Sequence, residues 1–270
     1  MKNINKPTVL ITGAASGIGK ATAEMYIEQG FTVYALDINE IEAIDGMRSF
    51  KCDITNSDSL NDVAERMQEC SVTLDAIVCV AGIHAMTSFV EGDVEKMKKL
   101  IDINLLGTIR TVRAFHRLLN STGRVIIVTS EVAAYAPMPF NGLYNVSKSA
   151  LECYAQSLRQ ELNLIGQKVI TVRPGATDTP LADSTTASTG ELSENTVLYK
   201  HQASRFLGLV NKFKGTPINP REIASIILKA TVKKRPRLTY TKHKSIGLVL
   251  LSWLPLRAQC AIIKLLLNKK

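Results

Sequence analysis

The chain has 270 residues, 46% of them hydrophobic, and a mean hydropathy near zero, which predicts a globular domain of ordinary composition, although two small domains remain an alternative. Its net charge of +9 belongs to the end of the chain: residues 223–270 hold 11 Lys and Arg and no acid, leaving 22 basic against 24 acidic residues in 1–222. Five Cys without a Cys-x-x-Cys pair or a Cys/His cluster exclude a disulfide framework and a zinc site, and we expect no metal.

A glycine-rich segment follows the first apolar run. Residues 8–11 are apolar, Thr12-Gly13-Ala14-Ala15-Ser16-Gly17-Ile18-Gly19 comes next, and a helix-like segment then runs to Gly30. This order predicts a strand, a tight turn and a helix whose free N–H groups bind a pyrophosphate. The candidate cofactor-binding residues here are Gly13, Ser16, Gly17, Ile18 and Gly19.

Asp37 ends the second predicted strand, which begins at Phe31. A carboxylate at this place accepts hydrogen bonds from both ribose hydroxyls of NAD and repels the 2′-phosphate of NADP. Neither position 16 nor the position after Asp37 holds Lys or Arg. We therefore expect NAD rather than NADP, the alternative being that Asp37 is a helix cap or turn residue.

Strand-like and helix-like segments continue to alternate, which predicts a doubly wound α/β fold with a parallel sheet and flanking helices. The predicted strands are 50–52, 74–80, 125–129 and 168–172, and the predicted helices are 57–69, 94–119, 143–165 and 221–231. Ser130 and Gly175 follow the fifth and sixth strands directly. Open α/β sheets bind ligands at these carboxyl ends.

Tyr144 and Lys148 lie four residues apart in the predicted helix 143–165, so both side chains project from one face. A close ammonium in a shielded cleft favours the phenolate, and moving the pKa of Tyr from about 10 to about 7 takes about 4 kcal/mol. A ketone that accepts hydride becomes an alkoxide, whose oxygen needs a proton and hydrogen-bond donors that already point toward it. We expect Tyr144 to supply the proton, Ser130 a second hydrogen bond, and Lys148 the pKa shift and a ribose contact.

These motifs, in this order, resemble the short-chain dehydrogenase/reductase family over roughly residues 8–240. Residues 12–19 are similar to its T-G-x-x-x-G-x-G turn, and Ser130, Tyr144 and Lys148 to its catalytic trio. The resemblance implies a single Rossmann-like domain. It also implies that Asn104 is catalytic and positions a water beside Lys148. Further cofactor contacts implied by the resemblance are Asp53 with Ile54, Ala81 with Gly82, and Pro174, Gly175, Thr177 and Thr179.

Two features depart from the family pattern. Its Asn-Asn-Ala-Gly segment is Cys79-Val80-Ala81-Gly82 in this chain, and the gap between Ser130 and Tyr144 is one residue longer than in many members. Two alternatives to an NAD-dependent dehydrogenase therefore stay open. The first is an NADP(H)-dependent ketone or 3-oxoacyl reductase, and the second is a non-catalytic dinucleotide-binding regulatory protein.

Regular periodicity breaks down over residues 176–219, which we interpret as a substrate lid within a catalytic domain of residues 1–244. Asn219-Pro220 then begins the next helix. Apolar residues of the lid predict a pocket for an apolar secondary alcohol or ketone, hydroxysteroid-like or retinoid-like. They are Leu198, Phe206, Leu207, Leu209, Val210 and Phe213.

Residues 245–270 form a basic, apolar extension in which the run 245–256 contains Trp253 and Pro255. It is too short to span a bilayer and suits either a membrane surface or packing on protein. We expect a homodimer or homotetramer and no nucleic-acid partner, since no recognition motif accompanies the charge. Residues 1–7 show no secretory signal, which predicts a cytoplasmic protein, peripheral to a membrane if the extension binds lipid.

Overall fold

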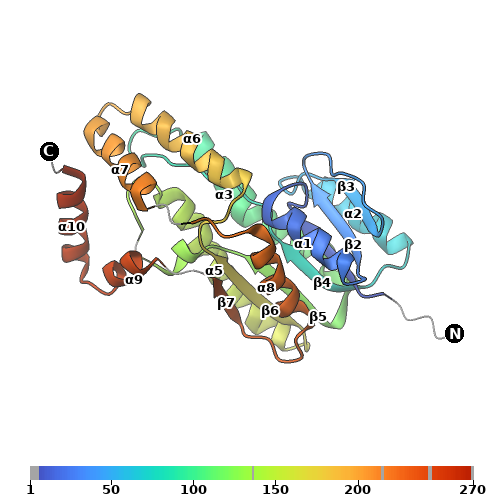
Figure 1. Cartoon of the computed structure of the whole chain (residues 1–270). Helices are drawn as coiled ribbons and strands as arrows, with labels where there is room; N and C mark the ends of the chain where they lie inside the picture. Colours follow the sequence, from blue (N-terminus) through green and yellow to red (C-terminus); the bar gives the residue numbers. More distant parts are fainter. Residues whose placement is uncertain (1–5, 136, 214–215, 243–244, 269–270) are drawn as a thin grey trace.

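The structure is a computed structural model that describes residues 6–135, 137–213, 216–242 and 245–268. Seven parallel strands form one sheet in the order β3-β2-β1-β4-β5-β6-β7 (Figure 1). The strands are β1 (Thr8–Thr12), β2 (Thr32–Asp37), β3 (Met47–Lys51), β4 (Leu74–Cys79), β5 (Leu119–Val128), β6 (Lys168–Pro174) and β7 (Thr239–Lys242).

Helices cover both faces of this sheet, which confirms the doubly wound, Rossmann-like architecture. On one face, α2 (Ser57–Glu69), α4 (Gly107–Phe115) and α5 (Gly142–Asn163) bury apolar side chains against the strands. On the other face, α1 (Gly17–Glu28) and α8 (Pro220–Val232) do the same. Adjacent residues of a strand point to opposite faces, so Leu10 of β1 packs in the first core and Ile11 in the second.

The strand order reverses between β1 and β4, which pair side by side although two strands separate them in sequence. From this point the chain winds outward to β3 on one side and to β7 on the other. Such a switch point opens a crevice at the carboxyl ends of the strands. The segments that follow β1, β4, β5 and β6 therefore meet at one edge of the sheet.

The segment predicted as one helix over 94–119 is interrupted at Asn104. It consists of α3 (Val94–Ile101), a π-helical turn η1 (Asp102–Leu106), α4, and a 3-10 turn η2 (His116–Leu118). β5 then begins at Leu119, six residues before the predicted start of the strand. A π-turn inserts one residue into the helical repeat, which apolar periodicity alone does not reveal.

The lid segment is mostly helical, contrary to its irregular sequence pattern. It contains α6 (Pro180–Asn195) and α7 (Lys200–Phe213). The Ser and Thr residues of α6 donate their hydroxyl hydrogens to carbonyls three or four residues earlier; examples are Thr185 to Leu181 and Thr189 to Thr185. These bonds satisfy the hydroxyls inside the helix, so polar composition does not exclude helix formation.

Three other elements bear on the prediction. Asn219 caps α8 as expected, since its Oδ1 accepts a hydrogen bond of 2.9 Å from the Arg221 amide and Pro220 takes the first helical position. The short edge strand β7 was not predicted. The last residues form α9 (Ile246–Ser252) and α10 (Leu256–Asn268), which flank Pro255.

Candidate active site

The glycine turn between β1 and α1 is packed against the end of β4. Gly13 has a φ of +73°, and a Cβ there would lie 2.8 Å from the Ala81 backbone. A Cβ on Gly19 would lie 1.8 Å from the Gly13 carbonyl oxygen. Side chains are therefore excluded at both positions, and the turn keeps a bare backbone surface as predicted for a phosphate cradle.

The first turn of α1 supplies uncapped amides beside this surface. Ser16 is the N-cap residue, but its exposed side chain makes no capping hydrogen bond. Gly17 and Ile18 begin the helix, and a Cβ on Gly17 would meet the Thr179 side chain at 3.0 Å. Uncapped N–H groups at a helix start attract anions. The donor set and the bare turn thus fit the pyrophosphate of a nicotinamide dinucleotide.

Asp37 closes the same turn from the end of β2. Its Oδ2 accepts a 3.0 Å hydrogen bond from the Ala15 amide, and its Oδ1 accepts one of 2.9 Å from the Asn39 amide. Lys51 pairs with Asp37 in the strand register, but its ammonium bonds to Glu40 at 3.1 Å. A backbone-held carboxylate therefore marks the place predicted for the adenosine ribose.

Asp53 and Ile54 lie in the turn between β3 and α2. The Asp53 Oδ1 accepts two hydrogen bonds of 2.8 Å, from the amide and the hydroxyl of Thr55. Ile54 is buried and fills the space that a side chain at Gly107 would need. Both residues have local structural roles in addition to the adenine contact that the family resemblance implies.

The segment after β4, which lacks the family's asparagines, is held by Thr12 of β1. The Thr12 hydroxyl accepts hydrogen bonds from the amides of Val80 and Ala81, at 3.3 and 3.4 Å. Gly82 comes next, and a Cβ there would lie 3.1 Å from the Asn104 Oδ1 and 3.5 Å from the Lys148 Nζ. This segment therefore brings the glycine turn and the predicted catalytic residues together.

Asn104 is fully buried in the π-turn and fixes this segment rather than pointing to open space. Its Oδ1 accepts a 2.8 Å hydrogen bond from the Ile83 amide, and its Nδ2 donates to the Ile83 carbonyl at 2.9 Å and to the Ser147 hydroxyl at 3.1 Å. Both ends of the amide are engaged by protein. These contacts give the Asn104 side chain a positioning role between β4 and α5, and its water-positioning role stays a prediction.

Ser130 and Tyr144 meet at the end of β5. Ser130 starts the 3-10 turn η3 (Glu131–Ala134), Tyr144 lies in the first turns of α5, and both are buried. Burial raises the pKa of Tyr144 to about 12, and a hydrogen bond with Ser130 opposes this increase. The expectation of a Tyr pKa near 7 is therefore wrong for the protein without cofactor, because desolvation disfavours the phenolate. Tyr144 is a protonated donor at neutral pH.

Lys148 lies one helical turn beyond Tyr144. Its Nζ is 5.7 Å from the centre of the Tyr144 ring and donates a 3.3 Å hydrogen bond to the Val128 carbonyl. Burial lowers the pKa of Lys148 to about 8, because an enclosed ammonium loses its hydration. Tyr144 and Lys148 share a face of α5 as predicted, with a buried ammonium that titrates close to neutral pH.

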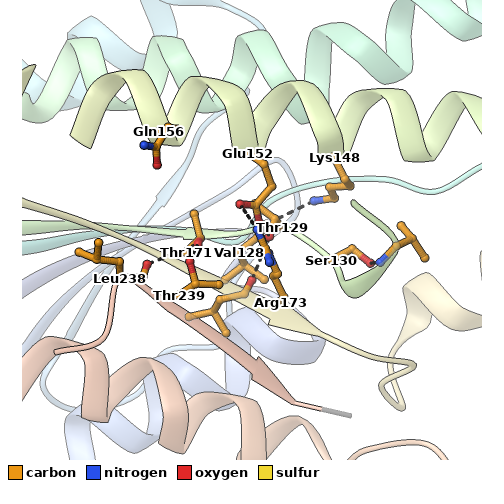
Figure 2. Close-up of polar contacts among 12 residues, drawn as sticks. Val128, Thr129, Ser130, Lys148, Glu152, Gln156, Thr171, Arg173, Leu238 and Thr239 are labelled. Atoms are coloured by element: carbon orange, nitrogen blue, oxygen red, sulfur yellow. Dashed lines mark hydrogen bonds and ion pairs between the residues drawn. The ribbon is translucent and has the colours of Figure 1, made fainter. Parts of the chain in front are cut away.

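An ion pair continues this face of α5. Figure 2 shows Lys148, Glu152 and Gln156 along the helix above the ends of β5 and β6. The Arg173 guanidinium donates two hydrogen bonds of 2.8 Å to the Glu152 carboxylate, and the Thr129 hydroxyl donates a third of 2.6 Å. Burial raises the pKa of Glu152, but the hydrogen bonds from Arg173 and Thr129 outweigh it and lower the pKa overall.

His84 and Phe140 are site residues that sequence reasoning missed. The His84 ring lies 4.3 Å from the Tyr144 ring, its Nε2 is 2.9 Å from the Asn141 Oδ1, and its Nδ1 is enclosed without a partner among the described residues. Phe140 has a φ of +65°, a strained conformation for an aromatic residue. No spacing or composition pattern marks either residue, because each depends on the fold of the loops after β4 and β5.

The segment after β6 leads from the sheet to the lid. Pro174 ends β6, the Gly175 amide donates to the Lys242 carbonyl, and the Thr177 hydroxyl donates to the Gly175 carbonyl at 2.9 Å. Thr179 is the N-cap residue of α6 and contacts Gly17 of the turn. Thr179, one of the cofactor contacts that the resemblance implies, therefore lies beside the glycine turn.

Helix α7 closes the site with an apolar cluster. Phe206 packs edge-to-face on Phe140 with ring centres 5.6 Å apart, and Met86 and Leu267 complete the buried part. Leu209 and Val210 pack against it as predicted, whereas Leu198 is exposed and does not line this wall. The side chain of Phe213 lies outside the described residues.

Comparison with known proteins agrees with this geometry. Residues 7–190 match the family model described as short chain dehydrogenase. An NADPH-dependent 1-acyldihydroxyacetone phosphate reductase of Schizosaccharomyces pombe is 33% identical over 207 residues, 72% of this chain and 68% of its own. A 3-ketodihydrosphingosine reductase of Bacteroides thetaiotaomicron is 30% identical over 252 residues, 92% and 93% of the two chains.

A solved structure with the same fold is the short chain dehydrogenase family protein from Francisella tularensis. It superposes with a TM-score of 0.73 at 24% identity and covers 87% of this chain and 96% of its own. The matched model spans most of the chain, and it includes the glycine turn, Ser130, Tyr144 and Lys148. The chain is therefore an oxidoreductase that belongs to the short-chain dehydrogenase/reductase family.

Proposed function

We propose that this protein transfers a hydride between NAD(H) and a ketone or secondary alcohol on an apolar molecule. The observation that carries the proposal is the buried pair Ser130 and Tyr144, which lies above the Lys148 ammonium and beside an apolar cluster that includes Met86 and Phe206. The pair offers two hydroxyls to one developing alkoxide. The nicotinamide supplies or receives the hydride when it is bound.

The protein's own residues handle the proton and the charge. Tyr144 is protonated at neutral pH, so its hydroxyl donates a proton to the alkoxide formed by ketone reduction. Ser130 donates a hydrogen bond to the same oxygen. Lys148, fixed by the Val128 carbonyl, stabilises the resulting phenolate, and Asn104 holds the adjacent backbone through Ile83.

Asp37 supports NAD as the cofactor. Its carboxylate is held by the Ala15 and Asn39 amides, which keeps a negative charge where NADP would carry its 2′-phosphate. The Schizosaccharomyces pombe relative, by contrast, is named as NADPH-dependent. An NADP(H)-dependent ketone or 3-oxoacyl reductase is therefore the competing function, and kcat/KM measured with each cofactor separates the two.

The apolar cluster under α7 supports an apolar substrate. Phe140 and Phe206 form its aromatic part, and Met86 continues it toward the segment after β4. The names of the two relatives describe reductases of ketones with an acyl or a sphingoid chain. We therefore place chain-like ketones first among the substrates, ahead of the hydroxysteroid-like or retinoid-like alcohols that the lid sequence indicates.

A substrate screen tests this function. Long-chain 3-ketones, hydroxysteroids, retinol and medium-chain alcohols would be assayed with NAD(H) and NADP(H) by absorbance of the reduced nicotinamide. The proposal predicts turnover of an apolar ketone or alcohol with NAD(H), and loss of that turnover in Tyr144→Phe. A protein that binds the dinucleotide but turns over none of these compounds would instead be the non-catalytic regulatory protein.

A further inference from the structure

The last two helices form a surface that the proposed oxidoreductase chemistry does not use. We call α9 and α10, with the turn between them, the C-terminal arm (residues 245–268). Figure 1 shows the C-terminal arm at one side of the molecule, far from strands β1, β2 and β3. Among the described residues, no helix combines the length and the apolar character needed to cross a membrane.

The C-terminal arm is fixed to the body at both ends. At its start, the Ser245 amide donates a 3.1 Å hydrogen bond to the Glu131 carboxylate, next to Ser130. At its end, Arg205 of α7 donates to the Leu266 carbonyl, and Leu267 is buried beside Phe206. The arm is therefore a docked part of the structure and presents a defined outer surface.

That outer surface is apolar. Ile246, Leu250 and Trp253 follow the spacing i, i+4, i+7, so they lie on one helical face, and they are 75%, 54% and 77% exposed. Leu256, the first residue of α10, is 76% exposed. On α10, the buried Leu267 and the partly buried Ile263 face α7, whereas Leu265 and Leu266 are exposed. A contiguous group of exposed large apolar residues marks an interaction surface.

The charge of the C-terminal arm indicates the kind of partner. Residues 245–270 contain four basic residues and no acid. Arg257 and Lys264 lie seven residues apart on α10, hence on one helical face beside the apolar one. A second group of basic residues lies between α8 and β7, before the amino end of β7. The C-terminal arm follows the carboxyl end of β7. The two groups of positive charge therefore lie at opposite ends of the sheet. The residues of the second group are Lys233, Lys234, Arg235 and Arg237.

We propose that the C-terminal arm docks on an anionic lipid bilayer. Exposed Trp and Leu residues flanked by basic side chains suit the headgroup region, where apolar burial and attraction to acidic lipids add. In a twofold contact with a second copy, two C-terminal arms would face each other instead. Each is basic and has no acidic residue, so their charges would repel. Since α10 packs on α7, which covers the apolar cluster beside Tyr144, docking places that cluster at the bilayer surface.

Trp253 is the only Trp of the chain, so its fluorescence reports on this surface in the unmodified protein. Purified protein would be mixed with phosphatidylcholine vesicles with and without phosphatidylglycerol. We expect a blue shift of the emission, quenching by brominated lipid and co-sedimentation with the anionic vesicles at low salt, and at least a tenfold weaker binding at high salt. An unchanged emission maximum with anionic vesicles at low salt would overturn the proposal.

Variants separate the two parts of the surface. Ile246→Ser/Leu256→Ser should lower vesicle binding at least tenfold, and Arg257→Gln/Lys264→Gln should lower binding to anionic vesicles only. The matched control is Leu164→Ser, an 85% exposed Leu at the end of α5, which should bind as the wild type does. If Ile246→Ser/Leu256→Ser instead dissociates an oligomer while vesicle binding is unchanged, the arm is a subunit interface and the lipid proposal is wrong.

Discussion

Arg173 donates two hydrogen bonds of 2.8 Å to Glu152, one helical turn beyond Lys148 on α5. The pair joins α5 to the carboxyl end of β6, and the Thr129 hydroxyl extends it to β5 (Figure 2). The helix that carries Tyr144 and Lys148 is thereby fixed to the two strands that lead to Ser130 and Gly175. The face of α5 that holds Tyr144 and Lys148 is thus fixed by a polar contact outside the recognised motif.

Glu152→Gln should therefore destabilise the protein. It leaves the half-buried Arg173 without its carboxylate, and we expect the free energy of unfolding to fall by about 1–3 kcal/mol. Urea denaturation at neutral pH measures this change. The matched control is Glu95→Gln, which removes an exposed ion pair with Lys98 and should cost less than about 0.5 kcal/mol. Equal losses in the two variants would show that the Glu152 pair has no special structural role.

His84 should make stability depend on pH. The pKa of His84 is lowered from 6.5 to about 4, chiefly by burial, with the Asn141 hydrogen bond opposing this shift and the nearby Lys148 ammonium adding to it. Between these values the unfolded chain binds a proton that the folded protein does not, so stability falls as pH decreases from about 6.5 to about 4. The difference corresponds to about 3 kcal/mol.

Urea denaturation of the wild type and of His84→Phe at pH 7.5, 5.5 and 4.5 tests this prediction. The wild type should lose more stability than the variant over this interval, because the variant has no imidazole to protonate. His201, which is exposed, supplies the control His201→Phe, which should follow the wild type. Parallel curves for the wild type and His84→Phe would contradict the prediction.

Asp37 should determine cofactor preference. Asp37→Ser removes the carboxylate held by the Ala15 and Asn39 amides, which weakens NAD binding and relieves repulsion of NADP. The ratio of kcat/KM for NAD(H) to that for NADP(H) should fall at least about tenfold, equivalent to ~1.4 kcal/mol. Asp45→Ser, at an exposed position, is the control that should leave the ratio unchanged. The same ratio in Asp37→Ser and wild type would mean that Asp37 is only a turn residue.

Lys148 should produce a decline of activity above about pH 8. Its buried ammonium loses its proton near that pH, and with it the charge that we expect to bind the ribose and stabilise the phenolate. We expect kcat/KM for NADH to be level below about pH 8 and to fall above it. Lys148→Ala should be impaired in both cofactor affinity and turnover, and its residual activity should lack this decline. A wild-type profile that stays level to pH 10 would exclude Lys148 from this role.

The sequence predicted the fold well where one physical signal determined the structure. Parallel strands and the glycine turn follow from apolar runs and from φ values that only glycine adopts readily. Tyr144 and Lys148 share a face because helical spacing requires it. β7 was missed because four residues with mixed burial give no clear alternation, and α6 because its hydroxyls bond within the helix.

Electrostatics was the least predictable part of the site. The charge of Lys148 predicts a low pKa for Tyr144, whereas burial predicts a high one. Which effect on the Tyr144 pKa is larger depends on distances that the sequence does not contain. In the structure, desolvation dominates at both residues. Likewise, the Asn104 amide is engaged by Ile83 and Ser147, a contact that requires the π-turn to be known.

Activity of Tyr144→Phe tests the central claim most directly, because the ring remains and only the hydroxyl proposed as the proton donor is lost. Turnover of the apolar ketone or alcohol found in the screen should fall at least about a hundredfold, the low end for loss of a general acid, while NADH affinity measured by calorimetry stays within about twofold. Tyr135→Phe, at a partly exposed position outside the Tyr144–Lys148 pair, should retain wild-type turnover. Tyr144→Phe turnover within tenfold of the wild type, with cofactor binding intact, would contradict the assignment of Tyr144 as proton donor.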